Sequence, residues 1–586
     1  MKKQPKIDII RHSLAHVLAS AVYEMFPEGK FGMGPAVENG FYYDFDLPRT
    51  LIPEDLEILE EKMRNIIKAN YKFERAEISV DVAIKDFRKA KQPYKVELIK
   101  DILKESKSKK NKSGYELRVT GYKTGDFVDL CSGPHLDSTG EINPASFKLT
   151  KISGAYWKGD EKNKMLQRIY GVAFESPKEL RQYLAMMQEA EKRDHKKLGR
   201  ELDLFSFHEE SQGSTFWHPK GMSVWNEIEN FGKGLRKKYG FLEIQTPILA
   251  KDSLWKISGH WDHYKDSMFH FDAEKETYCL KPMDCPFNIK IYQTKLRSYR
   301  DLPIRYTEIG RIMRNEKSGE LNGLFRARYL TQDDSHIFCL PEQVEKEISI
   351  LLKMIKEYYP TFGIEPKFFL STRPDDFMGK ISEWDLAEKN LANALKLEKI
   401  KFKIKEEDGA FYGPKIDIDI KDALGRNWQL ATVQLDFQMP QRFKLEYIDK
   451  NGKKQTPVMI HAAIFGSFER FIGILTEHYA GAFPLWLSPV QVEIIPVSEK
   501  FGKYAQEVFQ KLAAENIRVV MKDASESLGK RIREAQKEKV NYMLIVGEKE
   551  MKAKTVAVRD REKGDLGAIK IENFLEKIRK EIQDKK

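Results

Sequence analysis

The sequence predicts a multidomain protein in which α+β domains are followed by an α/β domain at the carboxyl end. Its 586 residues exceed what one hydrophobic core usually supports, so about three or four domains are expected. Helical and strand patterns are mixed up to residue 488, and short apolar strands alternate with helices after it. With 41% hydrophobic and 32% charged residues, the chain can form packed cores and lacks the composition typical of disorder.

Four segments follow from these patterns. Residues 1–175 mix helices with alternating strands, such as the one that starts at Tyr115, which indicates an α+β domain. Residues 176–205 are charged and begin with a Ser-Pro start signal, which predicts one long connecting helix. Residues 206–488 are rich in strand-like runs and have the size of an enzyme core built on an antiparallel sheet. Residues 489–586 show the α/β pattern.

Charge and cysteine content restrict the partners and the compartment. The net charge of +11 favours a polyanionic partner, because lysine and arginine replace the counterions around phosphates, although solubility alone is the plain alternative. Residues 489–586 carry 22 Lys and Arg against 17 Asp and Glu, so this segment is the best candidate for a nucleic-acid-binding module. Four cysteines are too few for a disulfide framework in a chain of this length. No run approaches the about eighteen uncharged apolar residues that a membrane-spanning helix needs. We therefore expect no membrane association and a cytoplasmic location.

Two histidines and a second element with a thiol form the first candidate site. A helix is predicted after Asp8, a plausible N-cap, and His12 and His16 share the face of this helix opposite to its apolar stripe. Cys131 and His135 directly follow a strand-like segment. Exposed surface histidines are the plain alternative. Three imidazoles and a thiol are plausible zinc ligands, but they also suit acid, base and positioning roles in a hydrolytic pocket, and the spacing does not decide between these uses.

The strings RHSLAHVLASAV and CSGPH around these four residues resemble the editing domain shared by threonyl- and alanyl-tRNA synthetases. The resemblance implies a pocket that hydrolyses seryl-tRNA and in which a bound metal is not required. Residues 154–171 resemble the small subdomain that closes this module. Because His12 lies so near the start, the resemblance also implies that the ubiquitin-like domain that usually precedes the editing domain is missing.

Two blocks of the central segment suit a nucleotide. Residues 314–336 contain Arg314, an acid, a glycine-containing turn and a second strand, and an arginine fork can hold the α-phosphate of ATP. Residues 466–474 place Arg470 at the start of an apolar helix, where it suits the γ-phosphate. Together these blocks resemble motifs 2 and 3 of class II aminoacyl-tRNA synthetases. Residues 222–247 resemble motif 1, the dimer-forming helix and strand, which implies a homodimer.

Three further strings, which contain Cys285, His336 and His461, resemble the zinc-ligand sites of threonyl-tRNA synthetases. The resemblance implies one Zn²⁺ per subunit in the catalytic domain, with a fourth position open to substrate. The plain alternative is a buried cysteine with two unrelated histidines. The chain departs from the family at Phe287-Asn288, where Gly-His is usual, and at Arg328-Tyr329-Leu330, where Arg-Gly-Phe is usual.

The same resemblance assigns the other site residues. The residues implied to bind ATP or the adenylate are Arg314, Glu316, Arg326, Lys415, Gln429 and Arg470, and Arg314 and Arg470 are implied to be catalytic. The residues implied to line the amino-acid pocket are Gln332, Asp334, Tyr412, Gln434 and Ser467, and Asp334 is implied to bind the threonine hydroxyl. The C-terminal segment resembles an anticodon-binding domain, in which Glu550 and Arg559 are implied to contact anticodon bases.

The implied activity is ATP-dependent ligation of L-threonine to tRNA(Thr) through a threonyl-adenylate, with Mg²⁺ accompanying ATP. A site that binds the hydroxyl can reject valine by about 10⁴–10⁵, whereas serine lacks only a methyl group, worth roughly 10–200-fold. A second site that hydrolyses seryl-tRNA(Thr) is therefore expected. The alternatives are another class II member, such as a seryl or prolyl synthetase, and a non-catalytic RNA-binding paralogue.

Overall fold

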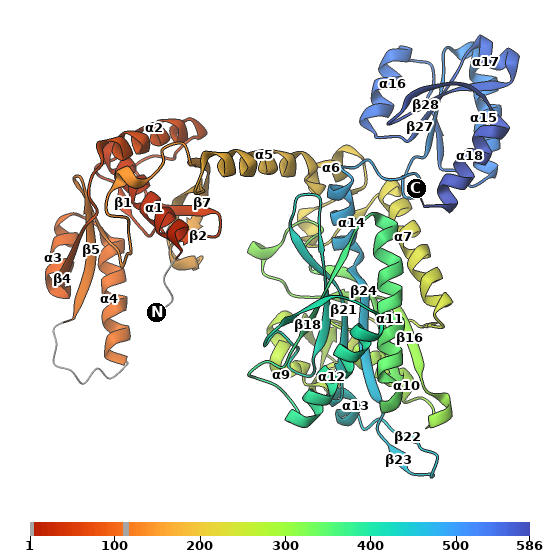
Figure 1. The fold of residues 1–586 in the computed structure, drawn as a ribbon, viewed down its shortest axis with the longest axis horizontal. Helices are drawn as coiled ribbons and strands as arrows, with labels where there is room; N and C mark the ends of the chain where they lie inside the picture. Colours follow the sequence, from red (N-terminus) through yellow and green to blue (C-terminus); the bar gives the residue numbers. More distant parts are fainter. Residues whose placement is uncertain (1–4, 109–116, 586) are drawn as a thin grey trace. The chain divides into compact units, whose positions relative to one another are not determined.

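The computed structural model describes residues 5–108 and 117–585 (Figure 1). It divides between Gln188 and Glu189 into two compact units, called the first and the second unit below. Tyr115, where a strand was expected to start, lies outside the described residues; the strand that follows, β5, spans Arg118–Thr124.

The first unit is built on helix α1 (Lys6–Met25), which packs against α2 (Pro53–Ala69) and an antiparallel sheet of order β1-β3-β8-β7, with β2 paired to β3. The strands are β1 (Lys30–Phe31), β2 (Ala36–Val37), β3 (Gly40–Asp46), β7 (Phe147–Tyr156) and β8 (Met165–Ala173). Residues 154–171, which resemble a small closing subdomain, form the end of β7, the turn that follows it and most of β8 in this main sheet.

A second, smaller sheet completes the first unit. It has the order β4-β5-β6, with β4 at Glu74–Ser79 and β6 at Phe127–Leu130. Helices α3 (Val80–Lys89) and α4 (Pro93–Ser108) follow β4, and α3 packs against β4 and β5. Because β6 ends at Leu130, Cys131 lies where the chain leaves this sheet. The α+β class expected for this part of the chain is confirmed.

Helix α1 is more buried than its sequence pattern predicts. It begins at Lys6, so Asp8 lies inside the first turn, where its carboxylate accepts a hydrogen bond from Arg11 at 3.4 Å, and the predicted N-cap at Asp8 is wrong. His16 was expected on a face away from the apolar stripe, yet only 2% of it is exposed. The reason is that α2, β3, β6 and β8 contact the helix from several sides.

The predicted single connecting helix is also wrong, because two helices, α5 (Pro177–Arg193) and α6 (His195–Glu201), take its place. Asp194 interrupts the first helix and caps the second: its side-chain oxygen accepts hydrogen bonds from the backbone N–H groups of Lys196 and Lys197 at 2.9 and 3.0 Å. An N-cap of this kind satisfies N–H groups that have no partner inside the helix.

The second unit contains an eight-stranded sheet of order β11-β16-β17-β24-β21-β20-β18-β19, which is antiparallel except at its two edge pairs. Its strands are β11 (Leu242–Glu243), β16 (Ile304–Met313), β17 (Tyr329–Cys339), β18 (Pro366–Ser371), β19 (Phe402–Lys405), β20 (Lys415–Lys421), β21 (Asn427–Asp436) and β24 (Val458–Ser467). The predicted antiparallel core is confirmed.

Helices α7 (Pro219–Lys238), α11 (Val344–Tyr358), α12 (Ile381–Leu397) and α14 (Phe468–His478) pack on this sheet and share one hydrophobic core with it. The smaller strands are β9 (Phe205–Ser206), β10 (Phe216–Trp217), β12 (Leu249–Lys251), β13 (His270–Ala273), β14 (Glu276–Leu280), β15 (Arg297–Ser298), β22 (Tyr447–Ile448) and β23 (Lys454–Gln455). The smaller helices are α8 (Asp252–Ser258), α9 (His260–Tyr264), α10 (Cys285–Tyr292) and α13 (Gln438–Arg442).

The carboxyl-terminal part of the second unit has a sheet of order β26-β25-β27-β28-β29, parallel over its first three strands, as the α/β pattern predicts. The strands are β25 (Val492–Pro496), β26 (Val519–Met521), β27 (Tyr542–Val546), β28 (Thr555–Asp560) and β29 (Gly564–Lys570), and the helices are α15 (Gly502–Ala514), α16 (Leu528–Lys537), α17 (Glu548–Ala553) and α18 (Ile571–Gln583). Within residues 5–108 and 117–585, no helix is both long and apolar enough to cross a bilayer.

Candidate functional site

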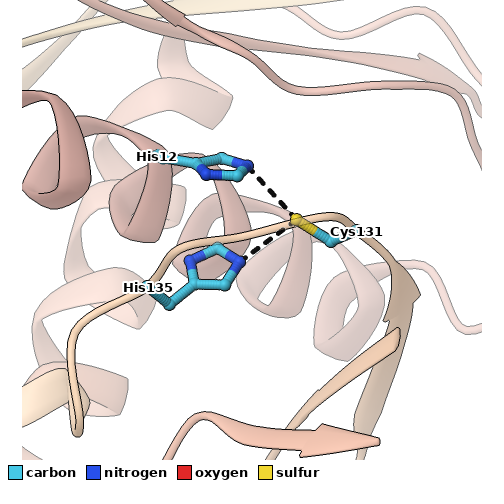
Figure 2. A group of neighbouring side chains, drawn as sticks. All are labelled: His12, Cys131 and His135. Carbon is cyan, nitrogen blue, oxygen red and sulfur yellow. Dashed lines mark hydrogen bonds between the residues drawn. The ribbon is translucent and has the colours of Figure 1, made fainter. Parts of the chain in front are cut away.

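Figure 2 shows His12 of α1 and His135 of the segment after β6 turned toward the sulfur of Cys131. Nε2 of each histidine lies 3.2 Å from that sulfur, and the centroids of the two rings are 4.4 Å apart. His16, one turn further along α1, lies with its ring 5.0 Å from that of His135. The structure therefore brings together all four residues of the first predicted site.

One order of protons satisfies every hydrogen bond of this cluster. The backbone N–H of Leu136 donates to Ser13 Oγ at 3.1 Å, and the Ser13 hydroxyl donates in turn to Nδ1 of His135 at 3.2 Å. Nε2 of His135 then carries a hydrogen, which it donates to Cys131, and the thiol donates to Nε2 of His12. A neutral thiol between two neutral imidazoles fits this chain of contacts.

Burial favours the neutral form of each group. It lowers the pKa of His16 to about 4 and that of His135 to about 2, and it also lowers the pKa of His12. It raises the pKa of the Cys131 thiol to about 11. Since the thiolate is the nucleophilic form of cysteine and neutral imidazole is a base, the cluster suits acid–base chemistry better than attack by sulfur. The ligand atoms of His12, Cys131 and His135 also lie within 4.8 Å of one another, a spacing compatible with a metal ion.

A buried ion pair beside this cluster escaped the sequence analysis. Lys95 Nζ lies 2.5 Å from one carboxylate oxygen of Asp129, and Tyr43 donates its hydroxyl hydrogen to the other at 2.6 Å. Lys95 and Asp129 also line a cavity of about 580 Å³. The spacing of Asp129 could have indicated it as a neighbour of this cluster. It precedes Cys131 by two residues, so both side chains point to the same side of an extended segment.

In the second unit, the structure brings together the three residues predicted to bind a metal. The ligand atoms of Cys285, His336 and His461 lie within 4.8 Å of one another. His336 on β17 pairs directly with His461 on β24, and Cys285 begins α10. All three are buried, and neither ring nitrogen of His336 has a hydrogen-bond partner among the described residues. Buried nitrogens are rarely left without a partner, and a metal ion bound here would provide one for His336.

Asp436, at the end of β21, is a further residue of this site that the sequence analysis did not identify. Its Oδ2 lies 2.9 Å from Nε2 of His461, while Oδ1 accepts the backbone N–H groups of Gln438 and Met439 at 2.7 and 3.0 Å. The carboxylate thus leaves Nδ1 of His461 as the nitrogen available to a metal. Metal-binding histidines commonly have such a carboxylate partner.

Three of the residues expected in the amino-acid pocket, Asp334, Tyr412 and Gln434, lie near the two histidines of this site. A carboxylate oxygen of Asp334 is 3.8 Å from Nε2 of His336. The Tyr412 hydroxyl donates to Oε1 of Gln434 at 2.5 Å, and the Tyr412 ring is 5.8 Å from that of His461. The two remaining residues, Gln332 of β17 and Ser467 of β24, face each other in the strand register.

The three arginines expected to bind phosphate lie close enough to affect one another electrostatically. Burial, followed by the positive charges of Arg314 and Arg326, lowers the pKa of Arg470. Arg470 Nε donates to the backbone oxygen of Phe325 at 3.2 Å, and Arg326 Nε donates to Glu316 at 2.9 Å. Arg326 is also paired with Glu320 at 2.7 Å, whereas no ion pair is found for Arg314 or Arg470 among the described residues. A group of guanidinium groups of this kind suits a polyphosphate ligand.

Lys415 and Gln429, also expected at the nucleotide, share one buried partner. Lys415 Nζ lies 3.0 Å from Oδ2 of Asp417, and Gln429 Nε2 donates to Oδ1 of the same residue at 2.6 Å. Asp417 is fully buried and also accepts a hydrogen bond from Ser371 at 2.7 Å. This carboxylate holds both side chains, and no sequence signal singled it out.

The two residues expected to contact anticodon bases lie on neighbouring elements of the carboxyl-terminal sheet domain. Glu550 is on α17, where its carboxylate accepts the backbone N–H of Gly547 at 2.9 Å, and Arg559 is on β28. Helix α17 packs against β28. Arg559 pairs with Met543 of β27 in the strand register.

Comparison with known proteins defines the class. Residues 266–479 match the family model "tRNA synthetase class II core domain (G, H, P, S and T)", residues 491–581 match "Anticodon binding domain", and residues 119–170 match "Threonyl and Alanyl tRNA synthetase second additional domain". The antiparallel sheet with its clustered arginines is thus the core of a class II aminoacyl-tRNA synthetase.

The curated relatives indicate which family within the class II synthetases this chain belongs to. The chain is 52% identical to the threonine–tRNA ligase of Caldanaerobacter subterraneus subsp. tengcongensis, over 98% of this chain and 87% of that protein. It is 51% identical to the threonine–tRNA ligase of Carboxydothermus hydrogenoformans, over 99% of this chain and 89% of that protein. A crystal structure from Cryptosporidium parvum Iowa II, described as the RNA binding domain of threonyl-tRNA synthetase, matches with a TM-score of 0.64 and 40% identity, over 66% of this chain and 98% of that one. The chain belongs to the threonyl-tRNA synthetase family.

Proposed function

We propose that this chain ligates L-threonine to tRNA(Thr) with ATP and hydrolyses seryl-tRNA(Thr) in its first unit. The observation that carries the proposal is the grouping of Cys285, His336 and His461, two of them on strands β17 and β24, in the same domain as the clustered arginines. A seryl or prolyl synthetase would not require this set of buried ligands. The presence of Arg314 and Arg470 argues against a non-catalytic paralogue.

The metal of the second unit is proposed to be one Zn²⁺ per subunit. One thiol and two imidazoles are borderline-soft ligands that zinc favours, and three protein ligands leave a fourth position for substrate. The partnerless nitrogens of His336 and the Asp436–His461 hydrogen bond support this fit. When bound, zinc would supply a Lewis acid for the amine and hydroxyl of threonine; valine shares the amine but lacks the hydroxyl.

The side chains hold the reactants for adenylate formation. Arg314, Arg326 and Arg470 balance the negative charge of ATP, which is accompanied by Mg²⁺. A threonine carboxylate oxygen attacks the α-phosphorus, and the bond to pyrophosphate breaks. A ribose hydroxyl at the 3′ end of tRNA(Thr) then attacks the threonyl carbonyl and releases AMP. Since no protein nucleophile takes part, positioning and charge stabilisation are the main contributions of the protein. Glu550 and Arg559 are proposed to contact anticodon bases.

In the first unit, a neutral imidazole of the His12–Cys131–His135 cluster is proposed to take a proton from water as the water attacks the seryl ester carbonyl. The carbonyl bond to the ribose oxygen breaks, and that oxygen receives a proton. Burial lowers the pKa of His12, so this imidazole is unprotonated at neutral pH, as a base must be. The synthetic site cannot complete the rejection of serine, because one missing methyl group is worth only about 10–200-fold.

A homodimer and a cytoplasmic location complete the proposal. The segment after α7 exposes three large apolar side chains, Leu242, Ile248 and Leu249, and an exposed apolar patch often marks an interface. Light scattering on the purified chain tests the dimer. The cytoplasm is where ATP and tRNA are available.

The experiment that tests the two activities compares aminoacylation of tRNA(Thr) with hydrolysis of preformed seryl-tRNA(Thr). His12→Ala should leave threonylation near normal and reduce seryl-tRNA hydrolysis by about 10²–10⁴-fold, the usual range for an acid–base group. Val82→Ala, at an exposed position of α3, is the matched control in the same unit. Equal hydrolysis by wild type and His12→Ala would contradict the editing role, and failure of the wild type to threonylate tRNA(Thr) would contradict the synthetic one.

A further inference from the structure

His195 is a buried histidine of the second unit that none of the steps above uses. It begins α6 and is only 1% exposed. Its Nδ1 lies 2.8 Å from Oε1 of Glu477, and its own backbone N–H donates to the same oxygen at 3.1 Å. On the opposite side of the ring, Nε2 lies 3.1 Å from the backbone nitrogen of Leu324. The ring also packs against Phe325, with centroids 4.1 Å apart.

These contacts determine which ring nitrogen carries the hydrogen. The backbone N–H of Leu324 can only donate, so Nε2 of His195 must accept this hydrogen bond. The hydrogen of the neutral ring is therefore on Nδ1, which donates a hydrogen bond to Glu477. Asp194, His195 and Glu477 are close enough together for a metal site. Because both ring nitrogens already have protein partners, the hydrogen bonds account for this group without a metal.

The backbone that His195 holds belongs to the loop between β16 and β17. Within this loop, the N–H of Asn322 donates to the backbone oxygen of Arg326 at 3.1 Å, which closes a turn around Leu324. The oxygen of Phe325, the next residue, accepts from Arg470 Nε at 3.2 Å. A single imidazole thus anchors the turn from which one phosphate-binding arginine projects and to which another is bonded.

The other partner of His195 lies at the far end of the helix that carries Arg470. Glu477 is in the last turn of α14, is buried, and is also paired with Arg426. Arg193, two residues before His195, donates to the backbone oxygens of Glu477 and His478 at 3.3 and 3.0 Å. The break between α5 and α6 is therefore attached both to α14 and, through His195, to the loop before β17.

We propose that His195 is a positioning residue for ATP. By joining Leu324 to Glu477, it holds the turn at residues 322–326 at a set distance from α14, so that Arg326 and Arg470 converge on the same phosphates. This inference rests on the proposed ATP-binding role of the two arginines. It adds that helix α6 contributes a side chain that organises the nucleotide site.

The test measures the KM for ATP and the KM for threonine in pyrophosphate exchange. His195→Ala removes both hydrogen bonds of the ring, to Leu324 and to Glu477. It should raise the KM for ATP about tenfold and leave the KM for threonine within twofold. His195→Gln, whose amide can still accept from Leu324, should recover most of the loss. His270→Ala, at a histidine of β13 bonded to the Met268 backbone, is the control and should behave as wild type.

Hydrogen exchange of the peptide around Leu324 provides a readout that does not depend on activity. In His195→Ala this amide should exchange faster, while the amides of β17 keep their wild-type rates. An unchanged KM for ATP, an equal rise in both KM values, absence of rescue by His195→Gln, or unchanged exchange at Leu324 would overturn the proposal. If the wild type showed no threonine-dependent exchange, the proposed function would fail instead, and calorimetric ATP affinity with the same variants would decide the role of His195.

Discussion

Asp436→Asn is the substitution whose effect follows most directly from the geometry of the proposed zinc site. The carboxylate of Asp436 is buried and accepts from Nε2 of His461 at 2.9 Å. The substitution removes the negative charge from this contact, so the His461 imidazole is less strongly oriented and less basic toward a metal at Nδ1. Asparagine keeps an oxygen for the N–H groups of Gln438 and Met439, whereas alanine would leave both buried donors without a partner.

The expected loss of metal affinity follows from the loss of the carboxylate partner of His461. Removing a hydrogen-bonding partner of a metal-binding histidine typically weakens metal binding about 10–100-fold, or roughly 1.4–2.7 kcal/mol. This range agrees with the roughly 1.5–3 kcal/mol net contribution of a hydrogen bond to a charged group. We therefore expect the zinc dissociation constant to rise by at least about tenfold while the fold is retained.

The assay is competition for zinc with a chromophoric chelator, followed by threonine-dependent exchange at increasing zinc. Activity of Asp436→Asn should be low at limiting zinc and return as zinc is added. Glu493→Gln, which replaces a buried carboxylate in the carboxyl-terminal domain, is the matched control. A zinc affinity of Asp436→Asn equal to that of the control would refute the role of Asp436 as the partner of a metal-binding histidine.

Three further predictions test other parts of the account. Arg470→Ala should reduce exchange by about 10²–10³-fold with tRNA affinity nearly unchanged, as filter binding would show. The folded-state pKa of His16 is about 4, below its ordinary 6.5, so unfolding binds a proton in this pH range and the contribution of His16 to stability should fall by up to ~3 kcal/mol as the pH drops from 6.5 to 4. In urea titrations His16→Phe should show a weaker pH dependence than the wild type, and the part that remains comes from His12 and His135, whose pKa values are also lowered. Lys95→Met leaves Asp129 buried without its cation and should cost the first unit roughly 3–5 kcal/mol in the same titrations, a cost that Lys95→Met with Asp129→Leu should largely remove.

Sequence patterns predicted the candidate site residues that lie in long characteristic strings. Cys285, His336 and His461 each stand in such a string, and the strand register then places His336 opposite His461. The same holds for His12 and Cys131, which come from segments far apart in the chain but meet at 3.2 Å. Local strings of this length identify residue types and spacing, so they predict sites without requiring the tertiary fold.

Long-range partners could not be predicted in this way. Asp436 and Asp417 are acidic residues in apolar strands, and only their side-chain hydrogen bonds in the folded sheet show that they hold His461 and Gln429. Burial of His16 arises from elements that wrap α1, which helical periodicity does not describe. The break at Asp194 was missed because the charged segment on both sides of it favours helix, and only the capping hydrogen bonds separate the two helices.

The central claim is that the second unit activates threonine through a metal site that recognises its hydroxyl. Amino-acid-dependent ATP–pyrophosphate exchange with threonine, serine and valine tests this claim most directly. We expect strong exchange with threonine, exchange with serine weaker by roughly 10–200-fold, and rejection of valine by about 10⁴–10⁵. Exchange with valine comparable to that with serine, or exchange with another amino acid in place of threonine, would contradict it.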